Sequence, residues 1–347
     1  MKLAAILSVL ACGVTAAMWL RVSPVMGNTN WAPPAGLIAG SFLGGMVLDR
    51  WKHKTALIIG LALLSGGLWR LLLGPASHAA LLAVSGLLAA GAGISMLAAS
   101  AVVIQTTVLN HASALAVVNV VLPVGMLCNP VLSPSTISYA AATLATLSLA
   151  AAIATPMPPA GDRGMDTAAV PRLIPLMAVF ALFGLYEGAI WNWLVPFFGA
   201  IRILDRPDAW QVLSYGVPLG LIVGRIGVAR LLGNVKAITV LRINAAAMAF
   251  AAGLLLLARS PSASWVAAFC LGVAMSPVLP ATLALSNRIL PRFPGTGMGV
   301  VVASGAAGLA ASIPVVELLS ARFGLPAGML LLPAVSLPIA FLHVRKP

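Results

Sequence analysis

The sequence predicts an all-α integral membrane protein with twelve transmembrane helices, and its composition and the spacing of its apolar runs support this fold class. Of the 347 residues, 61% are hydrophobic and only 8% are charged, whereas about a quarter of the residues in a soluble domain usually carry a charge. Apolar runs extend along the whole chain, and 347 residues divided among twelve runs leave about 29 residues for each. About 20 apolar residues cross the hydrocarbon core of a bilayer, so each run can cross once and leave a short loop.

The expected spans fall into two sets of six. The first set lies at residues 3–26, 31–48, 55–74, 79–104, 113–132 and 136–154. The second set lies at residues 173–200, 209–229, 237–258, 263–288, 296–319 and 325–343. The connector between the sets contains Pro, Gly and Asp, which is typical of a linker. We therefore expect an N-terminal six-helix bundle at 1–154, a cytoplasmic linker at 155–172 and a C-terminal six-helix bundle at 173–347.

The first span of each half supports this division. The first 20 residues also resemble a signal peptide, but we interpret them as a transmembrane helix because further spans follow. Near the end of this span, a Trp, a Pro and a Gly recur 172 residues later in the first span of the second half. These pairs are Trp19 and Trp191, Pro24 and Pro196, and Gly27 and Gly199. A shift of half the chain length predicts parallel repeats, an arrangement found in transporters.

The basic residues predict the orientation of the chain. Twenty Lys and Arg against seven Asp and Glu give a formal charge of +13, but the basic residues lie in short connectors and form no basic face. We therefore expect no nucleic-acid partner. With the N-terminus inside, twelve basic residues lie on the inner side and six on the outer side. Because cytoplasmic loops collect Lys and Arg, both termini should be cytoplasmic, in a bacterial inner (plasma) membrane.

The connector between the second and third spans carries the sharpest local motif. Residues Gly45 to Lys54 resemble the GxxxD(R/K)xGx(R/K)(R/K) cytoplasmic motif of the major facilitator superfamily, with Asp49 and Arg50 at its centre. Gly45 permits close helix approach. The resemblance implies that Asp49 accepts hydrogen bonds from a helix N-terminus or an Arg across the bundle and closes an inner gate. Lys52 and Thr55 depart from the pattern, and the alternative is an ordinary basic inner loop.

Further stretches resemble the same superfamily. Gly224-Arg225 is similar to its eighth span and makes Arg225 a gating candidate, although no acid stands at the counterpart of Asp49. Residues 116–130 with Asn119, 271–282 with Ser276, and 296–308 resemble the fifth, tenth and eleventh spans of fucose-permease-like members. The resemblance implies a secondary transporter with two six-helix bundles that works by alternating access. Its first, fourth, seventh and tenth helices would line a cavity.

Glu187 is the candidate for proton coupling. It lies about 14 residues into the seventh expected span, and an acid near the bilayer centre costs on the order of 3 kcal/mol. Burial disfavours the ionised form, which suits a group that takes up and releases a proton during transport. The alternative is a neutral glutamic acid that holds helices together through hydrogen bonds. We interpret Glu317, near the outer end of the eleventh span, as a structural acid.

The expected solute-binding residues surround Glu187 or lie on the other cavity helices. They are Tyr186, Glu187, Trp191, Asn192, Asn119, Ser276, Trp19 and Arg21. The aromatic side chains could stack against a sugar or planar ligand, and Arg21 could attract anions to the cavity mouth or extend to the lipid headgroups.

The sequence thus predicts a monomeric secondary active transporter of a small organic solute, with a sugar or other polar solute favoured. Its partners would be the solute, protons and the lipid bilayer. An efflux pump for amphipathic compounds and a transport-inactive membrane assembly protein are the alternatives. No GK, HExxH or Ser-His-acid pattern is present, so we expect no cofactor, no metal and no enzyme activity.

Overall fold

The computed structural model describes residues 2–26, 31–51, 53–74, 77–107, 110–156, 171–291 and 293–341, and the side chains of residues 2 and 20–26 are not included. Within these ranges the chain is helical and contains no strand. The first half consists of α1 (Lys2–Met26), α2 (Ala32–Arg50), α3 (His53–Leu72), α4 (His78–Thr106), α5 (His111–Asn119), α6 (Val121–Met126), α7 (Cys128–Val131) and α8 (Pro134–Ala154).

The second half begins with α9 (Ile174–Ala200) and α10 (Arg206–Gln211), and α10 continues through a π-helical turn (Val212–Gly216) into α11 (Val217–Asn234). It then contains α12 (Ala237–Leu257), α13 (Pro261–Met275), α14 (Val278–Ile289), α15 (Pro294–Phe323), α16 (Leu325–Gly328) and α17 (Leu331–Phe341). The helices α5 to α7, α10 with α11, α13 with α14, and α16 with α17 each form one interrupted span. The described chain therefore contains twelve spans.

Nine of these spans in the described residues are long and apolar enough to cross a membrane, and two more, Leu3–Trp19 and Leu325–Phe341, are shorter apolar stretches. Helix α2 is the twelfth. The expected spans and the observed ones agree within a few residues at each end, so the predicted fold class is confirmed. The polar stretch 157–170 of the expected linker lies outside the described residues, so the division at 155–172 stays a prediction.

Local sequence explains where several spans begin and where one breaks. The side-chain oxygens of Ser77, Ser133 and Ser260 accept hydrogen bonds of 3.1 to 3.2 Å from backbone N–H groups in the first turns of α4, α8 and α13. Such caps satisfy donors that have no partner within the helix. Between α5 and α6 the helix is interrupted, and Pro123 there has no backbone N–H to donate to the carbonyl four residues earlier.

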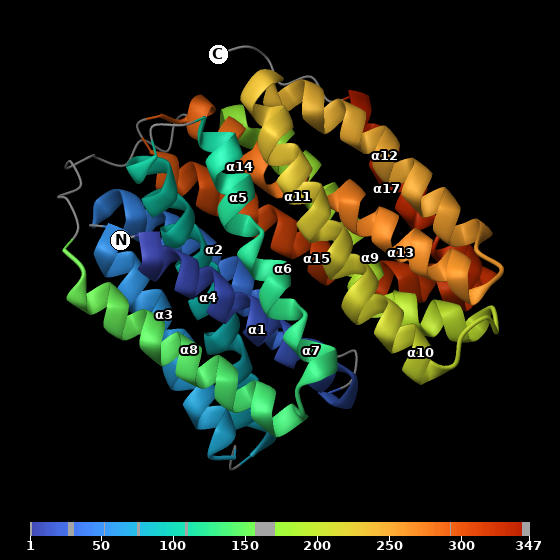
Figure 1. Ribbon diagram of the computed structural model, residues 1–347, viewed down its shortest axis with the longest axis horizontal. Helices are drawn as coiled ribbons and strands as arrows, with labels where there is room; N and C mark the ends of the chain where they lie inside the picture. The colour runs from blue at the N-terminus through green and yellow to red at the C-terminus, as the bar shows by residue number, and fades with distance from the viewer. Residues whose placement is uncertain are drawn as a thin grey trace.

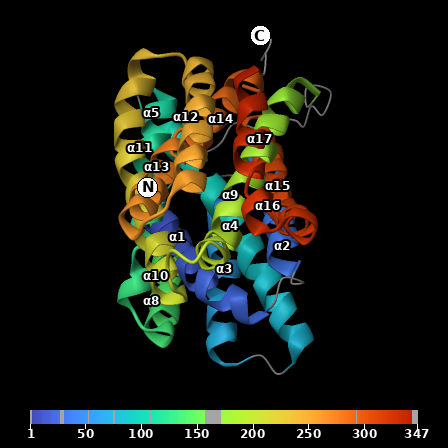
Figure 2. The same cartoon turned by 90° about the vertical axis from the view of Figure 1, so that its right-hand side faces the viewer.

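The helices form two groups that meet along two seams (Figure 1). Within the first half, α1 packs against α4, α6 and α8, and α3 packs against α4 and α8. Within the second half, α9 packs against α15 and α17, and α13 packs against α11 and α12. The α2–α15 seam and the α5–α11 seam join the two halves, and α15 lies beside α2 in the second view (Figure 2).

The two ends of this bundle differ, and we name them by residues. The closed end contains the last turn of α2, the first turns of α5 and α15, and the last turn of α11. The wide end contains the last turns of α9 and the first turns of α2, α8 and α10. Gly184 shows how closely helices pack within one half, because a Cβ atom there would lie 1.9 Å from the carbonyl oxygen of Gly305 in α15. Close packing of small residues is the usual basis of helix association in membranes.

Candidate functional site

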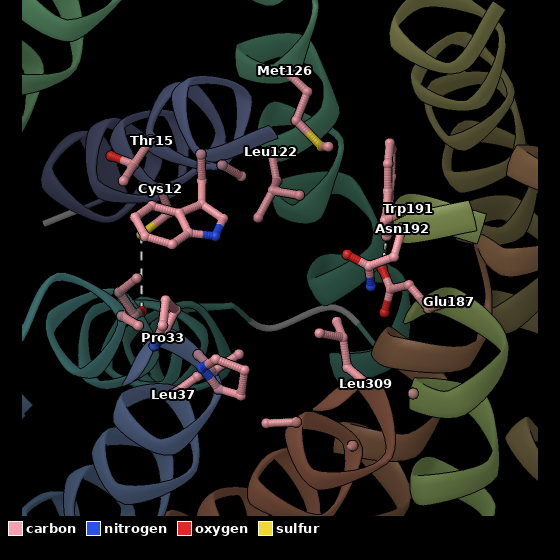
Figure 3. Close-up of a pocket in the computed structure, with 18 of the residues that line it drawn as sticks. Cys12, Thr15, Pro33, Leu37, Leu122, Met126, Glu187, Trp191, Asn192 and Leu309 are labelled. Carbon is pink, nitrogen blue, oxygen red and sulfur yellow. Dashed lines mark hydrogen bonds between the residues drawn. The ribbon is translucent and has the colours of Figure 1, made fainter. Parts of the chain in front are cut away.

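A cavity of about 1180 Å³ lies between the two halves. Helices α1, α2, α4, α6 and α8 line one side, and α9, α10, α11, α13, α14 and α15 line the other. Glu187 and Arg225 lie at its deep end, whereas the exposed residues Gly199 and Arg206 lie where it reaches the surface at the wide end. In Figure 3, Cys12 and Pro33 lie across the cavity from Glu187, Trp191 and Asn192. Each half of the protein therefore supplies one wall.

Most of the cavity wall is apolar. The larger apolar residues that line it are Leu37, Leu88, Met96, Leu122, Met126, Phe180, Phe183, Met275, Leu279, Leu309 and Ile313. Glu187, Arg206 and Arg225 are the charged residues in the described part of the wall, and Thr15, Ser85 and Asn192 add single polar groups. A site of this kind can enclose an apolar body and orient it through a few polar contacts.

Glu187 faces the cavity from the middle of α9. Its Oε1 accepts a hydrogen bond of 3.4 Å from Trp191 Nε1, one helical turn further along. The side-chain amide of Asn192 donates to the carbonyl of Gly188 at 2.8 Å. Residues four apart on a helix share a face, which places Trp191 above Glu187. The carboxyl group forms no ion pair with any residue in the described ranges. Its contact with Trp191 is a long hydrogen bond, and the side chain otherwise faces the cavity.

Arg225 approaches the cavity from α11 and is 6% exposed. Its guanidinium interacts electrostatically with Glu187, and its Nη1 donates to the backbone carbonyl of Asn119 at the end of α5. That carbonyl is available because Pro123, four residues later, has no N–H to offer it. The Nε of Arg225 has no hydrogen-bond partner among the described residues. Arg225 therefore bridges the α5–α11 seam with part of its donor set unused.

Asp49 closes the α2–α15 seam at the closed end. Its two carboxylate oxygens accept hydrogen bonds from the backbone N–H groups of Gly295 at 2.8 Å and of Thr296 at 2.6 Å. Both N–H groups belong to the first turn of α15, where they have no partner within the helix and where the helix dipole favours a negative charge. The structure thus shows Asp49 bound to a helix N-terminus across the seam, and its role in gating stays a prediction.

The α5–α11 seam is closed by a neutral contact. The side-chain oxygen of Asn110 accepts from the N–H of Ala112 and so caps α5, while its Nδ2 donates to the carbonyl of Leu232 at 2.8 Å. Leu232 lies in the last turn of α11, where carbonyl groups have no partner within the helix. The second half has no acid at the counterpart of Asp49. At this seam the side-chain amide of Asn110, from the first half, makes the contact between the halves instead. Sequence reasoning missed Asn110, although Asn before a helix is a capping signal.

Four of the expected solute-binding residues line the cavity: Glu187, Trp191, Asn192 and, near the wide end on α1, Trp19. The two Trp residues correspond to each other in the sequence repeat and lie in opposite halves. Arg21 belongs to α1, but its side chain lies outside the described part of the chain.

The structure does not place Tyr186, Asn119 and Ser276 in the cavity wall, which corrects their expected role as solute ligands. Tyr186 is fully buried, and its hydroxyl donates to the carbonyl of Met248 in α12 at 2.9 Å. Ser276 donates to the carbonyl of Val273 at 2.7 Å, and the amide of Asn119 donates to its own helix. Adjacent helical positions point about 100° apart, so Glu187 faces the cavity while Tyr186 faces a neighbouring helix.

The remaining gate candidates lie near the closed end or within the α5–α11 seam. Arg50 is exposed. Lys54 Nζ donates to the carbonyls of Ile153 at 2.7 Å and Thr155 at 3.1 Å, at the C-terminus of α8. A cation at a helix C-terminus complements the helix dipole. Arg225 bridges the other seam, as described above.

Gly45 brings α2 into direct backbone contact with α15. A Cβ at this position would lie 2.4 Å from the carbonyl oxygen of Gly295 and 3.0 Å from the Cα of Gly299. We expect Gly45→Ala to force the seam apart, because overpacking costs about 1–3 kcal/mol and backbone atoms cannot rotate away. A reporter Leu48→Cys, in a background without the three native cysteines, measures this change. Leu48 is 2% exposed and packs beside Gly295, so an impermeant thiol reagent should label it faster in the Gly45→Ala variant.

The matched control is Gly66→Ala in α3, where a Cβ would meet no atom within 4 Å. This control should leave the labelling rate at Leu48→Cys unchanged. Equal labelling rates in the Gly45→Ala variant and the parent would show that close approach at Gly45 does not hold the seam.

Two six-helix bundles enclose a central cavity, and contacts between the bundles close one end of it. This arrangement defines a membrane transporter fold. The family model of the Major Facilitator Superfamily matches residues 4–313. The chain belongs to the Major Facilitator Superfamily, as its sequence motifs indicate.

Solved structures agree with this assignment. The chain is similar to the transporter FucP in its outward conformation, with a TM-score of 0.81, 17% identity, and coverage of 99% of this chain and 97% of that chain. A variant of the E. coli fucose:proton symporter FucP gives a TM-score of 0.78 with the same identity and coverage. The human organic anion transporter MFSD10 (TETRAN) gives 0.76, at 14% identity and 98% coverage of both chains. The curated proteins gave no match.

Proposed function

We propose that this protein is a secondary active transporter of a small organic solute, which works by alternating access and is coupled to protons through Glu187. One observation carries the proposal: a cavity that contains Glu187 reaches the surface at the wide end, while Asp49 closes the opposite end. A transporter needs a central site that is accessible from one side at a time. A similar cavity is not needed by an assembly protein, which counts against the transport-inactive alternative.

The closed end is the cytoplasmic end in this proposal. Among the described residues, Arg50, Lys54, Arg230, Lys236 and Arg288 belong to this end, in keeping with the positive-inside rule. The described conformation is then open to the outside, with both termini in the cytoplasm of a bacterial inner membrane. Impermeant labelling of a cysteine at Asp208, in the first turn of α10, from the outside of intact cells tests this orientation, and labelling only from the inside contradicts it.

In the transport cycle, the contacts of Asp49 with α15 would break when the closed end opens. The wide end would close around the solute at the same time. Glu187 lies on the cavity surface in the middle of α9, so it can exchange a proton with whichever side the cavity faces. Protons can then drive the solute, provided that the protonation state of Glu187 and the occupancy of the cavity influence each other.

The cavity wall favours an amphipathic solute over a sugar. A sugar needs many hydrogen-bond partners, because each hydroxyl group that is buried without one carries a desolvation cost. The described wall offers few polar side chains and many apolar ones. The fucose:proton symporter and the organic anion transporter among the structural neighbours both act on small solutes, and the wall of this chain agrees better with a solute that has an apolar body. Efflux of amphipathic compounds is therefore the second candidate function.

Reconstitution of the purified chain in proteoliposomes tests the proposal. Uptake of a panel of radiolabelled sugars, alcohols, amines and organic acids is measured with a pH gradient of either direction and with none. A proton-coupled transporter accumulates at least one solute above its outside concentration under one gradient and loses this accumulation when a protonophore is added. Accumulation that the protonophore leaves unchanged contradicts proton coupling. No movement of any solute in any condition contradicts transport.

A further inference from the structure

Among the described residues of the cavity wall, Arg225 is the one buried cation, and no described carboxylate pairs with it at contact distance. Arg225 is 6% exposed, and the described residues form no ion pair with it. Glu187 interacts with it electrostatically, and the exposed Arg206 lies at the mouth. With two cations and one acid, the described wall has an excess of one positive charge when all three groups are ionised. Helices α1, α2, α4, α6, α8, α13, α14 and α15 contribute no charged group to it, and Cys12 is its other titratable residue.

The donor groups of Arg225 are unevenly used. Nη1 donates to the carbonyl of Asn119, which fixes the guanidinium at the α5–α11 seam. Nε has no acceptor among the described residues. On the planar guanidinium, Nε and Nη2 form the edge that binds a carboxylate through two parallel hydrogen bonds. The contact with Asn119 therefore orients the group, and a carboxylate that reaches it from the cavity would supply the acceptor that the buried Nε lacks.

From this arrangement we infer that the transported solute is an organic monoanion, whose acidic group pairs with Arg225 and whose apolar body lies against the cavity wall. Phe180, Phe183, Met275 and Leu279 provide apolar surface in the same cavity as Arg225. Only the acidic group then needs polar partners, in agreement with the small number of polar side chains in the described wall. The inference deepens the proposed function and rests on it, because the cavity must be the transport site.

A coupling mechanism follows from the charges. A bound anion and an ionised Glu187 would share the neighbourhood of Arg225 and repel each other. The complex is neutral at this site if Glu187 takes up one proton when the anion binds. By thermodynamic linkage, protonation of Glu187 strengthens anion binding by the same factor by which the anion strengthens protonation. The solute and the proton would then cross together.

Binding measurements on the full chain in lipid nanodiscs test the inference without requiring transport. The probes are phenylpropanoate and phenylbutanoate, each paired with its uncharged amide of the same shape. We expect each acid to bind at least about tenfold more tightly than its amide, because a paired and desolvated carboxylate contributes more than a neutral hydrogen bond. Calorimetry in two buffers of different ionisation enthalpy should show uptake of about one proton per acid bound.

Four variants locate the contact. Arg225→Gln should weaken acid binding by about thirtyfold and leave amide binding nearly unchanged, while Arg225→Lys should retain part of the acid preference. Arg202→Gln is the control, since it removes an exposed cation that does not line the cavity and should change the acid affinity by less than about threefold. Glu187→Gln should abolish the proton uptake and keep acid binding. Melting temperatures confirm that each variant is folded.

Equal affinity of acids and amides for the wild-type chain overturns the inference, and so does acid binding that is the same in the Arg225→Gln and Arg202→Gln variants. The inference is also overturned if neither of the two acids binds to the wild-type chain. These results are separate from those that test the proposed function. Gradient-driven accumulation of an uncharged solute would uphold proton-coupled transport and remove the anion inference. Acid binding with proton uptake but no gradient-driven transport would uphold the anion site and contradict the transporter.

Discussion

We expect Glu187→Gln to abolish accumulation of the solute under a pH gradient, while binding and exchange across the membrane persist. Glutamine keeps the size of the side chain and an oxygen that can still accept the hydrogen bond from Trp191, but it cannot take up a proton. The two conformations can still interconvert with bound solute, since binding and proton coupling are separate steps. In proteoliposomes, the variant should bring the solute to its outside concentration and no further, in the presence or absence of the gradient.

The control for this change is Glu317→Gln, which alters an exposed acid near the wide end of α15. It should leave accumulation as in the parent chain. If the Glu187→Gln variant accumulates solute as well as this control does, Glu187 has no part in coupling and serves the hydrogen bond with Trp191 alone.

We expect Asp49→Asn to shift the protein toward the conformation in which the closed end is open. The carboxylate accepts two hydrogen bonds from backbone N–H groups of α15, at 2.8 and 2.6 Å. Asparagine can accept only one of them and turns its own N–H₂ toward the other, and it also loses the charge that the helix dipole attracts. A charge-assisted hydrogen bond at a partly exposed site contributes about 1.5 kcal/mol, which corresponds to a roughly tenfold change in the conformational equilibrium.

The rate at which a thiol reagent labels Leu48→Cys measures this shift, as it does for the glycine variant. Labelling should be faster with asparagine at position 49 and transport should be slower, because the conformation open to the outside is less populated. Asp208→Asn in α10 is the matched control, since this acid is exposed at the wide end. An unchanged labelling rate with Asn at position 49 would mean that the α15 contact contributes nothing to closure.

The fold was predictable because the bilayer imposes a length on every apolar run. The twelve expected spans differ from the observed helices by a few residues, most at the C-terminal ends of α11 and α15, which continue to Asn234 and Phe323 instead of 229 and 319. Glu187 was identifiable for a related reason. An acid in the middle of an apolar span is costly and therefore stands out from its neighbours.

The direction of each side chain was not predictable. Apolar residues in these spans face the lipid, another helix or the cavity. The residue types are similar in all three environments, so the type does not indicate the direction. Tyr186 and Glu187 are adjacent, yet one contacts α12 and the other lines the cavity. Phe180 and Phe183 line the cavity, but phenylalanine is an ordinary residue of a membrane span, so the sequence does not distinguish them from their neighbours. The pairing of Arg225 with Asn119 joins residues 106 positions apart, which only the packing of the two halves brings together.

The hydrogen bonds between the halves are distributed unequally among the described residues, and in an alternating-access cycle this inequality would make one edge of the protein a hinge. Along the α5–α11 seam the halves are bonded at three levels: Asn110 with Leu232, Arg225 with Asn119, and Asn129 with Ser214 at 3.3 Å. At the α2–α15 seam the halves are in contact at Gly45 and Asp49, near the closed end. Further toward the wide end, the cavity separates Leu37 of α2 from Leu309 of α15. The two halves would then swing like a door, with α5 and α11 as the fixed edge and α2 and α15 as the free edge that travels furthest.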